Sequence, residues 1–246
     1  FILYLPMYIT LQSFVFQQTK SPIGVFIIQY LKEFALFIAL AVFIFYQSDL
    51  IRKKFKFNKI DLVFGAFIIL AFIFLVLPIG EVAFLAKAAY FKNILLMGLV
   101  YFLGRNMTLS NHQTQLTLKL ILGIALGAFC INLAEFASGI HFHTLVNYGN
   151  FQNVINDVEP TGNYGLSWTF ETQSGVKRFG AFFANPLDLA SASLLAFPIA
   201  FIFFIKTPHR TNQMLYGGFM MAIVGSLFFA YSRASLAAFI VELIFI

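Results

Sequence analysis

The amino-acid sequence predicts an all-α protein, a bundle of helices that crosses a membrane several times. Two observations lead to this class. Hydrophobic residues make up 60% of the 246 residues, whereas charged residues make up only 11%. The apolar runs are also long and close together, so they leave too little polar sequence for the surface of a soluble domain. The lipid bilayer must therefore be the solvent for much of the chain.

About eight spans follow if each crossing needs about 20 apolar residues, at a rise of about 1.5 Å per residue. We expect them at 1–16, 23–47, 60–79, 90–104, 116–139, 184–205, 214–231 and 234–246. Together they form one predicted transmembrane domain over residues 1–246. The first span has no initiating Met and the last stops within an apolar run, so we expect both to be incomplete and the chain to be a fragment of a longer protein.

A basic loop sets the expected orientation of these spans. Short loops rich in Lys and Arg stay preferentially on the cytoplasmic side. Alternation then places Lys87, Lys92, Arg233 and the segment from Gly139 to Ala184 on the outer side. The net charge of +6 fits membrane lipids as partners, because a basic cluster beside a span contacts anionic headgroups, and no nucleic-acid partner is expected. The five cations of the loop are Arg52, Lys53, Lys54, Lys56 and Lys59.

The segment from Gly139 to Ala184 is the one stretch long and polar enough to form an extramembrane element. Its Gly, Asn and Pro content predicts turns, and a weak alternation about Ser174 and Gly175 predicts a small hairpin. We expect an ordered loop that packs over the helix ends, because its aromatic rings suit a membrane interface. These aromatic residues are Phe142, Tyr148, Phe151, Tyr164, Trp168 and Phe170.

Three polar groups near the spans have competing interpretations. His141 and His143 have a spacing that can chelate a metal on an extended strand, but no third ligand is evident, so we interpret them as interfacial loop histidines. Glu135 is expected to snorkel to the interface, with the lining of a site as the alternative.

Lys32 and Glu33 fall within the second apolar stretch. A charge inside the membrane is a functional hint. The span could equally begin near Phe34 and leave the pair at the interface, so both interpretations stay open.

The sequence "NPLD" predicts a helix start. Asn185 suits the N-cap, Pro186 suits the first helical position, and Asp188 stands where a capping-box acid reaches back to the N-cap amide. The free amides and the positive dipole end of this helix would then face the region of Arg178.

Arg233 lies between two apolar runs. One continuous helix over 214–246 would be about 50 Å long, which exceeds a hydrocarbon core of about 30 Å. The chain must therefore turn between Ser232 and Ser235, which places Arg233 at the outer rim. Its planar, permanently charged guanidinium suits phosphate oxygens.

Two motifs carry a resemblance to a known family. The run "KRFGAFFANPLDLASASLLAFPIAFIFF", followed after a span by "AYSRASLAAFIVELI", resembles the core signature of the O-antigen ligase and O-antigen polymerase family. The resemblance is clearest over residues 176–246. One departure is "NPLD", where many members have a second Asn after the Pro.

The resemblance implies a C-type glycosyltransferase-like bundle in the bacterial inner membrane. Such an enzyme moves a glycan from a polyprenyl diphosphate carrier to an acceptor hydroxyl, on a glycan or a lipid, at the outer face. Arg178 and Arg233 would be catalytic and would stabilise the leaving diphosphate without a metal or another cofactor. Lys92, Lys87 and Asn185 would contribute to substrate binding.

The resemblance leaves two questions open. The resemblance does not distinguish a ligase from a polymerase. The general base could be His141, His143 or Glu135, but we expect it in a long outer loop after residue 246, which carries an essential histidine in the ligases.

Two other classes compete with a glycosyltransferase. A transporter or flippase subunit would also have many apolar helices and few polar residues, although no inverted repeat is evident. In a membrane scaffold without an active site, the two arginines would be accidents of topology.

Overall fold

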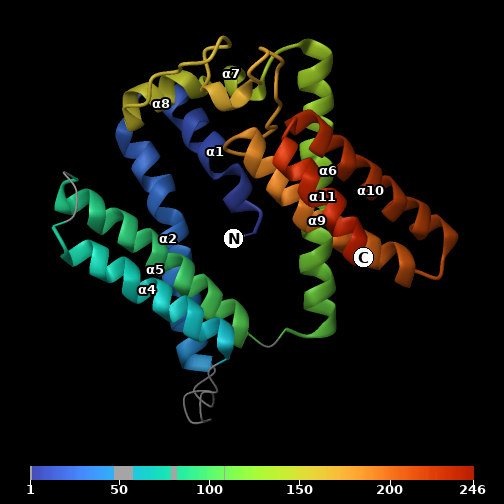
Figure 1. Ribbon diagram of the computed structural model, residues 1–246, viewed down its shortest axis with the longest axis horizontal. Coiled ribbons are helices and arrows are strands. Elements are labelled where there is room, and N and C mark those ends of the chain that lie inside the picture. Colours follow the sequence, from blue (N-terminus) through green and yellow to red (C-terminus); the bar gives the residue numbers. More distant parts are fainter. Residues whose placement is uncertain (1, 47–57, 79–81, 108) are drawn as a thin grey trace. The chain divides into compact units, whose positions relative to one another are not determined.

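The computed structural model describes residues 2–46, 58–78, 82–107 and 109–246. Its elements are helices, and within these ranges the strand-like pairing is one isolated bridge. In chain order the elements are α1 (Tyr4–Thr19), α2 (Pro22–Tyr46), α4 (Lys59–Val76), α5 (Phe84–Asn106), α6 (Asn111–Ser138), α7 (Phe142–Leu145), α8 (Tyr148–Asn156), the 3-10 helix η1 (Trp168–Phe170), α9 (Pro186–Lys206), α10 (Arg210–Ala230) and α11 (Arg233–Phe245) (Figure 1).

Six helices within the described ranges are long and apolar enough to cross a membrane, which indicates a multi-pass membrane protein. They are α2, α4, α5, α6, α9 and α10. The first and last predicted spans are also helices, α1 and α11, with 16 and 13 residues. At about 1.5 Å per residue, each is shorter than a hydrocarbon core of about 30 Å.

The helices form two compact units. Unit 1 comprises 1–29 and 110–246, and unit 2 comprises 30–109. The boundary falls inside α2. The single transmembrane domain expected from the sequence stays a prediction.

Unit 2 joins the second half of α2 to α4 and α5. Leu36, Phe43 and Leu103 form its buried core. Asp61 in the first turn of α4 accepts a hydrogen bond of 2.8 Å from the Tyr101 hydroxyl. It also forms an ion pair with Arg105. Four of the five cations on which the predicted orientation depends lie in 47–57, outside the described residues, so the orientation stays a prediction.

Unit 1 is built around α6, α9 and α10, which pack against one another, with α11 against α9 and α10 (Figure 1). Two apolar clusters lie between these helices. Small side chains allow the helices to approach closely, as Ala128, Ala190 and Ala230 are completely buried.

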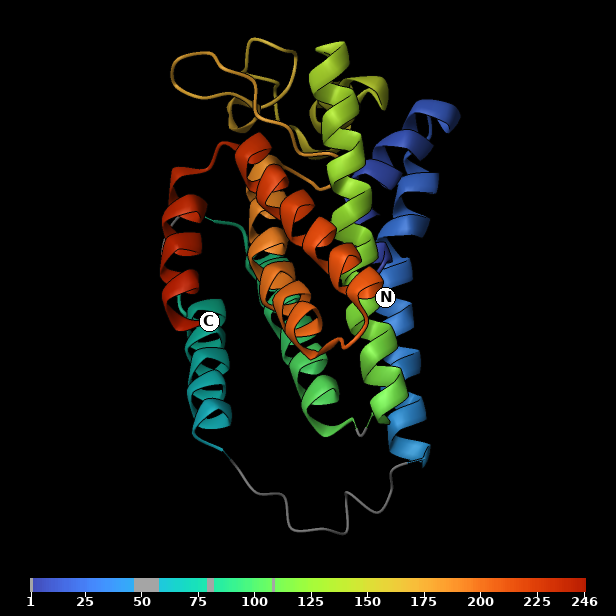
Figure 2. The same cartoon turned by 90° about the vertical axis from the view of Figure 1, so that its right-hand side faces the viewer.

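The segment between α6 and α9 folds over one end of these helices, at the end where α10 passes into α11 (Figure 2). Its Val146, Phe151 and Phe170 are buried in a cluster with Phe16 of α1 and Val25 of α2. This packing confirms the prediction of an ordered loop over the helix ends.

The predicted hairpin is present in a minimal form. Glu171 and Lys177 make one antiparallel bridge. The turn between them is closed by the Thr172 amide, which donates to the Val176 carbonyl at 2.9 Å, and it contains Gly175 at φ +78°. Glycine suits this left-handed conformation because it has no Cβ.

Glu135 fastens both ends of the loop to α6. One carboxylate oxygen accepts from the Phe142 amide at 2.7 Å, and the other accepts from the Ala181 amide at 3.1 Å. The Glu135 side chain is buried. The expectation that it snorkels to the interface is therefore wrong, because two backbone N–H groups satisfy the carboxylate inside the protein.

Candidate functional site

The helix break predicted between Ser232 and Ser235 is present, and it begins one residue earlier. α10 ends at Ala230, and Tyr231 adopts the left-handed conformation at φ +49°. The Ser232 hydroxyl then accepts from the Ser235 amide and caps α11. Arg233 is the first residue of α11, and its side chain is exposed.

Arg178, at the end of the hairpin, reaches the break between α10 and α11. Its amide donates to the Phe170 carbonyl at 2.9 Å, which fixes the backbone. Its Nε–H donates to the Ala230 carbonyl at 2.9 Å, and the residue is only 8% exposed. Burial lowers the pKa of the Arg178 guanidinium from its usual value, although an arginine remains protonated in a protein.

The start of α9 lies beside them. The Asn185 side chain accepts from the amides of Leu187 and Asp188, so Asn185 is the predicted N-cap and Pro186 follows it. The capping-box prediction is wrong in one respect. The Asp188 carboxylate accepts from the Asn185 side-chain amide at 2.9 Å instead of from its backbone N–H.

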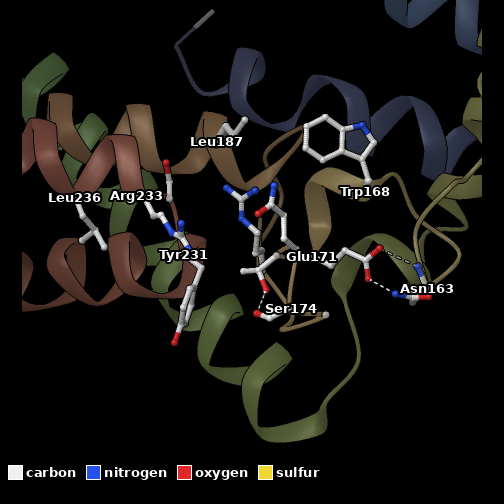
Figure 3. A pocket seen from close by; sticks show the side chains of 13 residues that line it. Asn163, Trp168, Glu171, Ser174, Leu187, Tyr231, Arg233 and Leu236 are labelled. Atoms are coloured by element: carbon white, nitrogen blue, oxygen red, sulfur yellow. Dashed lines mark hydrogen bonds between the residues drawn. The ribbon is translucent and has the colours of Figure 1, made fainter.

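A cavity of about 930 Å³ joins these elements. Arg178 and Arg233, 55 residues apart in the sequence, both line it, together with Leu187 from the first turn of α9. Figure 3 shows Asn163 and Trp168 at one end of the cavity, and Arg233 and Leu236 at the other. The other lining residues are Glu171, Thr172, Gln173, Ser174, Gly175, Tyr231 and Ser232.

The charges of the cavity are two arginines and one carboxylate. Glu171 accepts from the amide of Asn163 at 3.2 Å and from its side-chain amide at 2.7 Å (Figure 3). The lining therefore has one net positive charge, next to the amide ends of α9 and α11. Amide groups at helix N-termini attract anions, so this arrangement can bind a phosphate or another anionic group.

Sequence reasoning did not select Trp168, Glu171 or Asn163 as site residues. Each belongs to the loop 139–184, and Trp168 and Glu171 lie within the stretch predicted as a hairpin. The hairpin carries Glu171 and Arg178 into one cavity, since both flank its turn. The predicted hairpin was therefore the sequence signal that could have identified Glu171 as a neighbour of Arg178 in the site.

Lys87 and Lys92, the other predicted substrate-binding cations, lie on α5 of unit 2. Lys92 pairs with Glu33 at 2.8 Å, and the Lys87 amine donates to the Leu77 carbonyl at 3.1 Å. Their approach to the arginines stays a prediction. α2 runs without a break from Pro22 to Tyr46, so Lys32 and Glu33 lie within one continuous helix. Their position in the membrane or at its interface stays a prediction.

His141 and His143 are 2% and 0% exposed, so their interpretation as interfacial histidines is wrong. Their rings pack against Phe170, and the Nε2 atom of His143 lies 2.7 Å from the Phe183 carbonyl. Burial lowers the pKa of His141 to about 4, with a smaller contribution from the Lys177 charge. Burial lowers the pKa of His143 to about 3, although its hydrogen bond opposes this shift.

Neither histidine is well placed as a ligand or a base. Within the described ranges, no group of three or more His, Cys, Asp or Glu residues could hold a metal ion, so the pair has no third ligand there. The cavity is lined by neither histidine, nor by Glu135.

Comparison with known proteins gave no match to this chain among family models, curated proteins or solved structures.

Proposed function

We propose that this protein is a membrane glycosyltransferase of the O-antigen ligase or polymerase type. It would transfer a glycan from a polyprenyl diphosphate carrier to the hydroxyl of a glycan or lipid acceptor, at the outer face of the bacterial inner membrane. One observation supports this most. Arg178 and Arg233, the two arginines of the motifs that resemble the family, line one cavity although 55 residues separate them.

The local electrostatics of Arg233 fit an anionic substrate. A cation in the first turn of a helix opposes the helix macrodipole, so Arg233 stands where a negative side chain would be more stable. A diphosphate bound there would pair with the guanidinium and also accept from the free amides of α11. The neighbouring N-terminus of α9, whose Leu187 lines the cavity, adds the positive end of its macrodipole, because its Leu187 and Asp188 amides already donate to the Asn185 side chain.

The reaction requires charge stabilisation at the diphosphate. The acceptor oxygen attacks the anomeric carbon, the bond from that carbon to the diphosphate oxygen breaks, and the electron pair leaves with the polyprenyl diphosphate. The acceptor proton passes to a base. Arg178 and Arg233 would stabilise the leaving group, since they present fixed cationic donors where negative charge develops.

The test is transfer by the full-length protein in lipid vesicles, with a polyprenyl diphosphate-linked glycan as donor. Formation of a new glycosidic bond together with free polyprenyl diphosphate supports the proposal. Passage of the intact donor across the bilayer, without a new bond, would instead identify the transporter or flippase class.

A further inference from the structure

Trp168 differs from the other large aromatic side chains of the loop. It is 67% exposed and lines the cavity, whereas Phe151 and Phe170 of the same loop are each 1% exposed. An exposed tryptophan on a cavity wall provides a large, flat apolar surface for a ligand, with an N–H donor at its edge.

The position of Trp168 is fixed by its neighbours in η1. Phe170, two residues later, is buried in the core of the loop, and the Glu171 amide donates to the Trp168 carbonyl at 3.2 Å. The exposed ring is therefore carried on an ordered turn and not on a free chain. Stacking of a ligand on this ring therefore costs the protein loop little additional conformational entropy.

The loop residues that line the cavity together with Trp168 are rich in oxygen. The Glu171 carboxylate is held by Asn163. The hydroxyls of Thr172 and Ser174 bond to each other at 2.9 Å, and Gln173 is exposed beside them. Each Glu171 oxygen keeps a lone pair for a further donor, and each hydroxyl can both donate and accept.

This combination fits a saccharide. A sugar ring presents a face of C–H groups that packs on an aromatic ring, while its hydroxyls need hydrogen-bond partners at the rim. A bilayer surface fits less well, because lipid at Trp168 would bring apolar surroundings to the cavity that this ring shares with the Glu171 carboxylate.

We propose that Trp168, Glu171 and Asn163 form a sugar-binding wall, and that the saccharide attached to the diphosphate stacks on Trp168. This inference rests on the proposed function and assigns the two parts of the donor to opposite ends of the cavity. The diphosphate lies at the Arg233 end and the sugar at the Trp168 end (Figure 3). A volume of about 930 Å³ is large enough for such a ligand.

Binding can be measured without transfer. The probe is the water-soluble oligosaccharide that mild acid releases from the lipid-linked glycans of the producing cells, labelled with a fluorophore for polarisation measurements. We expect the full-length protein to bind it with a Kd of about 1 mM or tighter. Trp168→Ala should weaken binding at least about tenfold, and Glu171→Gln should weaken it by a similar factor. The control is Val154→Ala, which removes an exposed apolar side chain of α8 outside the cavity and should leave the Kd unchanged.

The outcomes separate this inference from the proposed function. Absence of binding by the unmodified protein, or an unchanged Kd in Trp168→Ala, overturns the sugar-binding wall even if transfer occurs. Binding that depends on Trp168 in a protein without transfer activity supports the wall and removes the proposed function. Quenching of Trp168 fluorescence by brominated lipids, but not by the unlabelled oligosaccharide, places the ring in the bilayer and also overturns the wall.

Discussion

The side chain of Arg178 donates from Nε to the backbone carbonyl of Ala230, the last residue of α10, at 2.9 Å. The carbonyls in the last turn of a helix lack intrahelical partners and carry partial negative charge. Arg178 therefore satisfies one of them and ties the hairpin to the end of α10, three residues before Arg233. The bond uses Nε, so the terminal amino groups of the guanidinium take no part in it.

This relationship gives the two arginines different structural roles, which lysine variants should separate. Arg178→Lys loses the Nε donor to a buried carbonyl and should destabilise the protein by about 1–3 kcal/mol. Arg233→Lys changes an exposed residue and should alter stability by less than about 0.5 kcal/mol. Both lose the bidentate guanidinium, so transfer should fall about 10²-fold in each. Thermal unfolding and the vesicle transfer assay measure the two effects. Near-normal transfer by both lysine variants would reject the role of the arginines at the diphosphate.

Glu135 should hold the loop over the helix ends. Its two oxygens accept from two backbone amides, and a glutamine side chain can replace only one of these acceptors because its other group is a donor. Glu135→Gln should cost about 1–3 kcal/mol and speed hydrogen exchange at the Phe142 and Ala181 amides. Glu159→Gln is the matched control, since Glu159 lies exposed in the same loop. Equal exchange at both amides in the variant and the unmodified protein would contradict this role.

The buried histidines should make stability depend on pH. The pKa of His141 in the folded protein is about 4, below the ordinary value of about 6.5, so the unfolded chain binds a proton first as the pH falls. The contribution of His141 to stability should be constant above about pH 6.5 and fall between about pH 6.5 and pH 4, by up to about 1.4 kcal/mol per pH unit.

Substitution isolates the contribution of His141. His141→Phe fits a site surrounded by Tyr164, Phe170 and Phe179, and it should reduce the pH dependence of the unfolding temperature. His209→Phe makes the same chemical change at an exposed position and should leave the pH dependence intact. An identical pH profile for His141→Phe and the unmodified protein would show that His141 does not titrate in this way.

The helices were predictable because the apolar runs are long, and hydropathy alone locates them. Two further features were predicted correctly: the Asn185 cap from residues within one turn, and the break before Arg233 because a continuous helix would exceed the hydrocarbon thickness. Helix ends were less well placed. α6 begins at Asn111 with a Ser110 capping box, five residues before the expected span, because a helix can continue through polar residues beyond the hydrocarbon.

The burial of the loop was not predictable to the same degree. His141, His143 and Glu135 are polar residues near an expected interface, and their burial depends on tertiary partners, such as the Ala181 amide, that no local pattern reveals. The lining of the cavity also depends on tertiary contacts that no local pattern reveals. Asn163 and Glu171 meet through a loop conformation, whereas the arginines were selected because a cation beside apolar spans is already conspicuous in the sequence.

The membrane orientation of unit 1 can be tested with two introduced cysteines on opposite ends of α6. His112 lies in the first turn of α6, and Glu159 lies in the loop beyond its last residue, and both are exposed. The basic loop 51–59 and the alternation of spans predict that residue 112 is cytoplasmic and residue 159 is outside. In a Cys130→Ala background, which removes the native thiol, Glu159→Cys should react with an impermeant maleimide in intact cells. His112→Cys should react only after permeabilisation. Labelling of His112→Cys in intact cells, with Glu159→Cys protected, would invert the orientation and place the arginine cavity on the cytoplasmic side, where the proposed acceptor at the outer face could not reach it.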